Sequence, residues 1–263
     1  MGRFFSGVIL LVVGFASSLQ AFWIGNPASP AIMEKGVVLG KKKGLCLKAD
    51  YLSDHVFETD FHEEIVAEDS ETSHVKVTTF AALLALTLAN RVDFYGILGG
   101  SQLKIDQSMY IPRRFSWGAG GRIVAYENCK CQVGVDVKYF TCDQQKPNYF
   151  VIEDMPALLI TPFLLKYQEW QGAVSFCYHF GAFLPYAGVT YIHTKIEPHP
   201  NMGGIDIPNL EMTLEFESRS VLNDHKWGGV VGLTLLSKSA ITLSFEGRFY
   251  NQNGVNVSAE IRF

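Results

Sequence analysis

The C-terminal stretch from Ala240 to Phe263 most constrains what this chain can fold into. Two segments there alternate apolar and polar residues, and the turn Asn251-Gln252-Asn253-Gly254 joins them. The apolar positions are Ile241, Leu243, Phe245 and Phe249, then Val255, Val257, Ala259, Ile261 and Phe263. Each segment has about the ~9–11 residues that a tilted strand needs to cross a bilayer. The pattern predicts a hairpin with one apolar and one charged face, as in a wall between lipid and water. A half-buried hairpin of a soluble sheet is the alternative.

The start of the chain has the features of a secretory signal peptide. Met1-Gly2-Arg3 is a short basic region, and Phe4 to Phe15 is apolar but too short to span a membrane. We expect cleavage after Ala21, with cleavage after Ser18 as the alternative, so residues 1–21 are excluded from the fold. Loss of Arg3 changes the formal charge from −4 to −5, a balance that argues against a nucleic-acid partner.

An exported, apolar-rich chain without a long apolar run has one way to cross a membrane. Hydrophobic residues make up 48% of the sequence, yet no stretch after the signal peptide approaches the ~18 apolar residues of a spanning helix. Strands must then satisfy their backbone by closing into a barrel. We predict an all-β, transmembrane, antiparallel up-and-down barrel over residues 44–263, preceded by an irregular segment over 22–43. We expect about 12 strands, within a range of 10–16, and an even number. A soluble secreted β-protein is the alternative.

Four further expectations concern particular segments. Closure requires Val255 to Phe263 to pair with the strand over Leu45 to Leu52. The acidic stretch Ser53 to Ser73 is interpreted as a solvated loop, and Glu197 to Asn209 as a long loop. Val75 to Ala89 fits either a strand or a buried helix, because its later part is apolar on both faces. Met212 to Glu217 alternates and is counted as a barrel strand.

Five short motifs in the right order resemble the chlamydial major outer membrane porin family. They are Gly25-Asn26-Pro27-Ala28, Cys129-Lys130-Cys131, Glu169-Trp170-Gln171 with the alternating run to Phe180, Leu184-Pro185-Tyr186-Ala187-Gly188-Val189, and the ending Val257-Ser258-Ala259-Glu260-Ile261-Arg262-Phe263. The resemblance implies an outer-membrane porin, either general or dicarboxylate-preferring, a homotrimer, and disulfide cross-links to other envelope proteins. Because the main porin is considerably longer, the chain resembles a shorter paralogue.

Polar residues on the alternating strands are the candidates for the pore lining. They are Lys48, Asp50, Asp136, Lys138, Glu169, Glu215, Glu217, Glu246, Arg248, Glu260 and Arg262. Charge selectivity needs residues of one sign gathered at a constriction, and these are mixed, so we expect weak selectivity. The alternative for each residue is a neutralised pair that lines a filled barrel.

The mature chain has an odd number of cysteines, which an oxidising envelope can pair. We consider Cys129, Cys131, Cys142 and Cys46 the disulfide candidates, and Cys177 less so because it lies in the middle of a strand. Cys129 and Cys131 are not expected to bond each other. Free thiols are the alternative.

Motifs for other functions are weak in this sequence. There is no G-x-S-x-G, phosphate-binding or dinucleotide fingerprint, so we expect no enzyme and no cofactor. His55, Asp60, His62, Glu63 and Glu64 are metal-ligand types without a zinc-site order, so no metal is expected. We predict a bacterial outer-membrane protein, in contact with lipid, that passes small hydrophilic solutes. The alternative is a structural or adhesive envelope protein with a plugged barrel.

Overall fold

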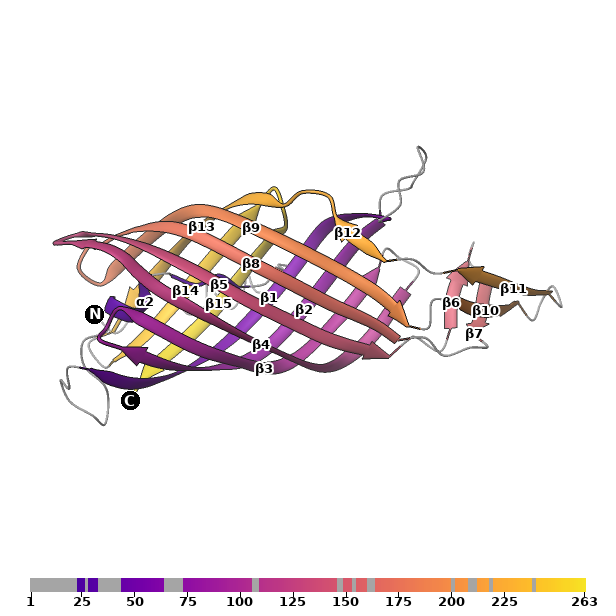
Figure 1. Ribbon diagram of the computed structural model, residues 1–263, viewed down its shortest axis with the longest axis horizontal. Coiled ribbons are helices and arrows are strands. Elements are labelled where there is room, and N and C mark those ends of the chain that lie inside the picture. The colour runs from indigo at the N-terminus through magenta and orange to yellow at the C-terminus, as the bar shows by residue number, and fades with distance from the viewer. Residues whose placement is uncertain are drawn as a thin grey trace, which may run out of the picture.

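The computed structural model describes residues 23–26, 28–32, 44–63, 73–105, 109–145, 149–152, 155–159, 164–199, 202–207, 212–217, 220–237 and 240–263. Its main body is a tilted-strand barrel with a small separate sheet beyond one end (Figure 1). None of the helices among these residues has the length and apolar content to span a membrane. The predicted signal peptide lies outside the described residues and stays a prediction.

Ten antiparallel strands form the closed wall, in an up-and-down order that follows the chain. They are β1 (Leu45–Glu63), β2 (Ser73–Leu88), β3 (Val92–Ile105), β4 (Met109–Asn128), β5 (Cys131–Gln145), β8 (Leu164–Tyr178), β9 (Phe183–His199), β13 (Trp227–Leu236), β14 (Ile241–Phe249) and β15 (Asn253–Arg262). The predicted fold class and the even strand number are confirmed, and ten lies at the lower limit of the expected range. We call the end with the turns β2–β3, β4–β5 and β8–β9 the turn end, and the opposite end the loop end.

The last strand closes the barrel against the first. β15 pairs antiparallel with β1 from Lys48↔Arg262 to His55↔Val255 and beyond, as closure requires. The hairpin strands β14 and β15 have 9 and 10 residues, whereas β1 and β9 have 19 and 17. The short strand β12 (Val221–Asn223) fills the resulting step at the loop end by pairing with both β1 and β9.

A second antiparallel sheet is built from two segments that leave the loop end. Its strands, in spatial order, are β11 (Met212–Glu217), β10 (Met202–Ile207), β7 (Met155–Leu159) and β6 (Tyr149–Ile152). The assignment of Met212 to Glu217 to the barrel wall was therefore wrong. An alternating six-residue segment looks the same in either sheet, because both have a side-chain period of two. The interpretation of residues 197–209 as a loop was wrong too, since β9 runs to His199 and β10 follows.

The first two strands of the wall settle two further expectations from the sequence. β1 continues through residue 63, so the first half of the acidic stretch is strand rather than loop. Its inward positions Asp54, Val56 and Phe61 are buried, and the acidic composition hid this alternation. Val75 to Leu88 is the strand β2, not a helix, and the turn residues Ala89 and Asn90 have φ of 52° and 55°.

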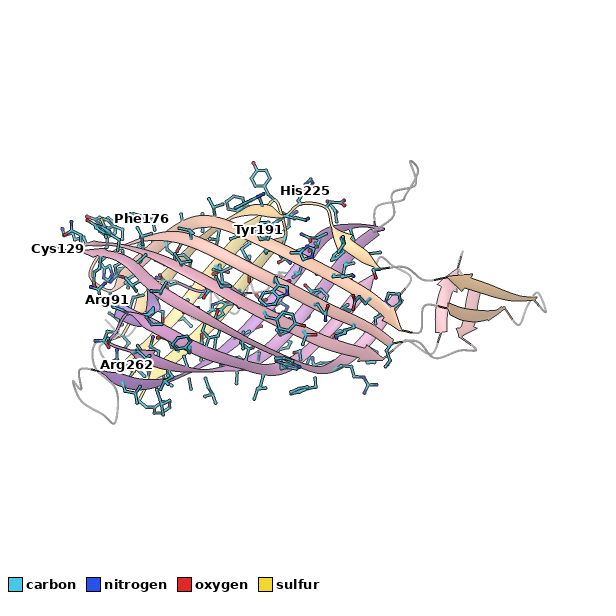
Figure 2. All side chains as sticks on the ribbon, viewed as in Figure 1. Arg91, Cys129, Phe176, Tyr191, His225 and Arg262 are labelled. Atoms are coloured by element: carbon cyan, nitrogen blue, oxygen red, sulfur yellow. The ribbon has the colours of Figure 1, made fainter. Side chains whose placement is uncertain are left out.

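Side chains on the wall separate by face. Leu47, Leu84, Phe94, Val137 and Val174 are among the exposed apolar residues on the outer face. Phe176, labelled in Figure 2, is another. On the closing hairpin Phe245, Val257 and Ile261 point outward, and Arg248 and Arg262 are buried inside.

Aromatic residues form a row on the outer face where the outward side chains change from apolar to polar. Tyr139 contacts both Trp117 and Trp170, with ring centroids 5.9 and 4.9 Å apart. Tyr191 and Trp227 continue the row with centroids 5.1 Å apart. Nearer the loop end, outward positions such as Lys76 and Lys166 are charged and exposed. An apolar band bounded by aromatic rings is the surface that a membrane-spanning barrel presents to lipid.

The N-terminal segment lies inside the barrel. It comprises residues 23–26 and 28–32, with the short helix α2 (Ser29–Ile32) at its end, and Trp23, Ile24, Asn26 and Ala28 are buried. We call these residues the plug segment. The sequence predicted an irregular segment here and gave no indication of its position.

Candidate functional site: the barrel lumen

Nine of the eleven predicted pore-lining residues face the interior and are buried. They are Lys48, Asp50, Asp136, Lys138, Glu169, Glu246, Arg248, Glu260 and Arg262. Their positions follow from the period of two, since every second residue of a barrel strand points inward. The remaining two, Glu215 and Glu217, are on β11 in the second sheet and leave the set.

Opposite charges meet inside the barrel across strands. Lys48 Nζ lies 3.0 Å from Asp93 Oδ2 and 3.8 Å from Glu260 Oε1. Arg122 Nε lies 3.0 Å from Asp136 Oδ2, and both Asp136 oxygens also accept from the Tyr95 hydroxyl. These carboxylates and cations neutralise one another locally, which burial out of water requires.

Arg248 makes a third network nearer the middle of the wall. Its Nη2 lies 3.3 Å from Asp54 Oδ1, and its Nε lies 3.5 Å from Glu246 Oε1. Sequence analysis missed three of the partners in these networks: Asp54, Asp93 and Arg122. Asp93 and Arg122 each alternate with apolar neighbours and were open to the same reasoning, whereas Asp54 fell in the stretch interpreted as loop.

The plug segment is seated on the carboxylate of Glu246. Both oxygens accept backbone N–H groups, one from Ile24 at 2.8 Å and one from Gly25 at 2.7 Å. The hydroxyl of Tyr186 also donates to Glu246 Oε2, at 2.9 Å. Hydrogen bonds to an ionised acceptor are about twice as strong as neutral ones, so Glu246 is the principal anchor of this segment.

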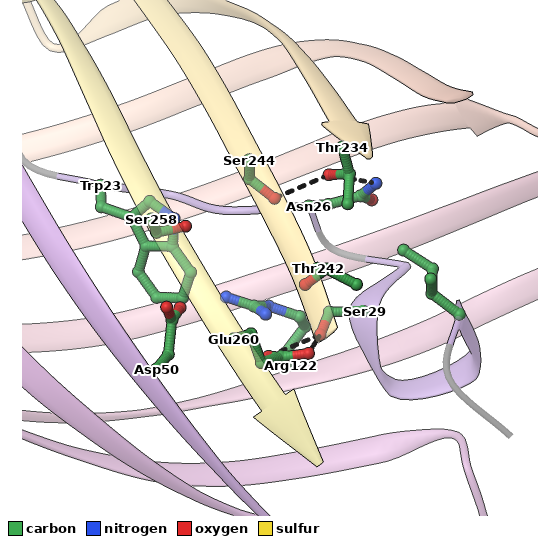
Figure 3. A pocket seen from close by; sticks show the side chains of 11 residues that line it. Trp23, Asn26, Ser29, Asp50, Arg122, Thr234, Thr242, Ser244, Ser258 and Glu260 are labelled. Carbon is green, nitrogen blue, oxygen red and sulfur yellow. Dashed lines mark hydrogen bonds between the residues drawn. The ribbon is translucent and has the colours of Figure 1, made fainter. Parts of the chain in front are cut away.

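A second carboxylate holds the other end of the plug segment. The Ser29 hydroxyl lies 3.0 Å from each oxygen of Glu260 (Figure 3). Lys48 Nζ donates to the Ser29 carbonyl and hydroxyl oxygens. The Asn26 side chain donates to Thr234 Oγ1 at 3.3 Å and lies 3.4 Å from Cys177 Sγ. The segment is therefore bound through β1, β8, β13, β14 and β15 together.

Trp23 lies deepest along the lumen among the described residues of the segment. Its ring lies 4.8 Å from the Arg122 guanidinium carbon and 5.3 Å from Lys138 Nζ, both cation–π distances. Gly25 follows with φ of 74°, and a Cβ there would come 2.3 Å from the Trp23 ring and 2.9 Å from Arg122 Nη2. Only glycine meets both the backbone and the space requirement at this point.

Buried side chains of described residues occupy both halves of the lumen. A cavity of about 10 Å³, enough for roughly one water molecule, remains between the plug segment and the wall. From mid-barrel to the loop end the interior holds a continuous group of buried, mostly apolar side chains, which we call the outer apolar cluster. It contains Trp23 of the plug segment together with Leu52, Val56, Phe61, Val75, Val77, Ala81, Leu83, Ala85, Tyr95, Ile97, Leu103, Phe140, Cys142, Leu165, Tyr167 and Ile196 of the wall. The described state is closed.

The four disulfide candidates have different surroundings. Cys129 is exposed at the tip of the β4–β5 turn (Figure 2), and Cys131 is half-buried beside it. Cys46 and Cys142 face the interior and are buried. The contrast between Cys142 at a strand end and Cys177 in mid-strand was wrong, because Cys142 lies three residues before the end of β5 and Cys177 lies one residue before the end of β8. No disulfide joins any two of the five cysteines, all of which lie among the described residues. Among the residues described, no three His, Cys, Asp or Glu side chains converge on a metal-binding arrangement.

Comparisons with known proteins support the resemblance found in the sequence. The major outer membrane porin, serovar E, of Chlamydia trachomatis is 21% identical, and the match covers 98% of each chain. The major outer membrane porin of Chlamydia abortus is 20% identical with the same coverage. The first alignment extends over 390 positions and this chain has 263 residues, so the relative is longer where this chain has gaps. The predicted resemblance to this porin family, as a shorter chain, is confirmed.

No protein-family model matches the chain. Among solved structures, the translocator domain of the autotransporter NalP from Neisseria meningitidis matches with a TM-score of 0.45 and 11% identity, over 84% of this chain and 89% of that one. The outer membrane protease OmpT from Escherichia coli matches with a TM-score of 0.44 and 7% identity, over 82% and 93%.

Proposed function

We propose that this chain is a porin of the bacterial outer membrane that lets small hydrophilic solutes and ions diffuse passively. The observation that carries the proposal is the closed ten-stranded wall, apolar outside and charged inside, in a chain similar over 98% of its length to chlamydial major outer membrane porins. Short turns of such barrels face the periplasm, so the turn end, where β1 begins and β15 ends, is the periplasmic end.

The proposed pore is weakly selective and not catalytic. Lumenal residues of both signs lie next to one another, as in Lys48 with Asp93 and Arg122 with Asp136, so the described residues form no ring of one charge. A dicarboxylate preference is the alternative, and it would need unpaired cations at the constriction. A gradient of potassium chloride should therefore give a reversal potential near zero.

Conduction requires the filled lumen to open. Both the plug segment and the outer apolar cluster occupy the path in the described state. A second candidate function follows from this filling: a closed barrel that acts as a structural envelope protein. In that case exposed Cys129 at the periplasmic end would cross-link the barrel to other envelope proteins, and assembly as a homotrimer would serve packing rather than transport.

Planar-bilayer recording distinguishes the two functions. Folded protein added to a bilayer should give discrete single-channel steps, with long closed periods because the described state is closed. Heat-unfolded protein is the control and should give none. A silent membrane containing protein that is folded by circular dichroism contradicts the porin and favours the structural barrel. Liposome swelling with sugars and with dicarboxylates then ranks the solutes.

A further inference from the structure

We propose that the plug segment is a displaceable plug, anchored by Glu246, whose departure opens the periplasmic half of the lumen to water. The inference goes beyond passive transport and rests on the proposed orientation, but its test does not require the barrel to conduct. It concerns how residues 23–26 and 28–32 fit against the wall, not the charge of the lumen in general.

The plug segment makes both apolar and polar contacts. Trp23 packs in the outer apolar cluster, and Ile24, Ala28 and Ile32 pack in a second buried cluster that includes Cys177. The Glu246 carboxylate accepts from the backbone of Ile24 and Gly25, and Ser29 donates to Glu260. Arg122 Nη2 in turn donates to the carbonyl oxygen of Ile24 at 3.0 Å. Every one of these wall groups can be rehydrated if the segment leaves, because all are charged and strongly hydrated in water.

The wall around the plug segment is complete without it. Every strand of the barrel pairs with its two neighbours, and the closure of β1 on β15 involves no residue of the segment. Removing residues 23–32 therefore breaks no strand pairing. A segment that contributes contacts but no part of the wall can leave while the barrel remains folded, since local openings cost less than global unfolding.

A native thiol reports directly on the position of the plug segment. Cys177 on β8 faces the lumen, is buried, and has the Asn26 side-chain nitrogen 3.4 Å from its sulfur. Cys142 on β5 is also buried but belongs to the outer apolar cluster. When the plug segment leaves, Cys177 becomes accessible from the periplasmic mouth and Cys142 does not. Global unfolding exposes both.

The experiment measures how fast each cysteine reacts with a small charged thiol reagent in protein folded into lipid vesicles, with the modified sites resolved by mass spectrometry. Glu246→Gln removes the charge that accepts two backbone hydrogen bonds, so the rate at Cys177 should rise at least about tenfold. Gly25→Ala should act in the same direction, because φ and space at this position both exclude a side chain.

Glu169→Gln is the matched control. Glu169 is a buried lumenal carboxylate like Glu246, but its partners are Tyr167, Thr194 and Gln252 on the wall. This variant should leave the Cys177 rate within about twofold of the wild-type rate. The rate at Cys142 should stay unchanged in all three variants, which establishes that the barrel is folded.

Two outcomes overturn the proposal. In the first, Cys177 reacts no faster in either Glu246→Gln or Gly25→Ala than in the wild type. In the second, Cys177 and Cys142 become reactive together, because the segment then leaves only when the barrel unfolds. A faster Cys177 reaction in a protein that stays silent in planar bilayers supports the displaceable plug and refutes the porin. If the wild type forms channels but the Cys177 rate is unchanged in Glu246→Gln and Gly25→Ala, the porin is supported and the displaceable plug is refuted.

Discussion

Replacing Asp136 by asparagine tests whether the charged side chains in the lumen are shielded from water. Asp136 and Arg122 have side chains only 1% and 2% exposed, and their facing atoms are 3.0 Å apart. Removing one member of a buried pair leaves the other charge without compensation, which costs about 3–5 kcal/mol. The Tyr95 hydroxyl, which donates to both Asp136 oxygens, loses part of its partner as well. Asp136→Asn should therefore lower the free energy of unfolding by about 3–5 kcal/mol.

The chain contains a control pair with the same separation and free access to water. Arg91 and Glu127 also lie 3.0 Å apart, with side chains 53% and 37% exposed at the turn end. An exposed pair contributes less than about 1 kcal/mol, so Glu127→Gln should have a small effect. The double variant Arg122→Met with Asp136→Leu removes both buried charges and should recover most of the stability lost in Asp136→Asn.

Equilibrium unfolding in urea, with the protein reversibly folded into vesicles, gives the free energies of unfolding of the wild type and of the three variants by linear extrapolation. The slope against urea should stay the same in all variants, because the surface exposed on unfolding does not change. If Asp136→Asn costs no more than Glu127→Gln, water reaches the lumenal pair. The lumen would then be an open aqueous channel rather than the filled interior described above.

Three further predictions concern separate parts of the barrel. Gly188→Ala should lower the free energy of unfolding by about 1–3 kcal/mol, because the added Cβ would come 2.3 Å from the Val174 carbonyl oxygen. Gly172→Ala is the control: a Cβ there would have nothing within 4 Å, so the free energy of unfolding should change by less than about 0.5 kcal/mol. Urea unfolding measures both. A bulky maleimide should label Cys129 first in the folded protein and reach Cys46 and Cys142 only in urea; early labelling of Cys142 contradicts the inward placement. Burial lowers the pKa of His179, and the nearby Glu127 carboxylate raises it by a smaller amount. The folded state therefore disfavours the protonated ring, so the contribution of His179 to stability is present above its ordinary pKa and is lost as the pH falls through the lowered one. An NMR titration of the ring with a midpoint above about 6.5 contradicts this sign.

The inside and outside of the wall were predictable from the sequence because the period of two assigns every strand residue to one face. Leu243, Phe245 and Val257 lie outward, and Glu246 and Arg248 lie inward, as the alternation alone predicts. A barrel strand differs from a strand of the second sheet by its partners and not by its pattern. Met212 to Glu217 was misplaced for that reason.

The plug segment was not predictable from local patterns. Residues 23–32 have no periodicity, and the hydrogen bond from Ile24 to Glu246 joins residues 222 positions apart. Gly25 was noticed only within a motif shared with the porin family, although its positive φ and the crowding by Trp23 explain why glycine is required. Sequence reasoning identified Glu246 and Glu260 as inward carboxylates. It could not show that their hydrogen-bond donors come from the N-terminal segment of the same chain.

A cross-link between the first and last strands tests the closed barrel most directly. Ala49 on β1 and Ile261 on β15 are register partners on the outer face. With Cys129 and Cys131 changed to serine, the pair Ala49→Cys and Ile261→Cys should form a disulfide under mild oxidation in vesicles. The product is detected by the altered mobility of the unfolded chain in a non-reducing gel. The offset pair Ala49→Cys and Val257→Cys, separated by about 13 Å along the strand, should not react. A cross-link that forms equally in both pairs, or in neither, contradicts a sealed wall.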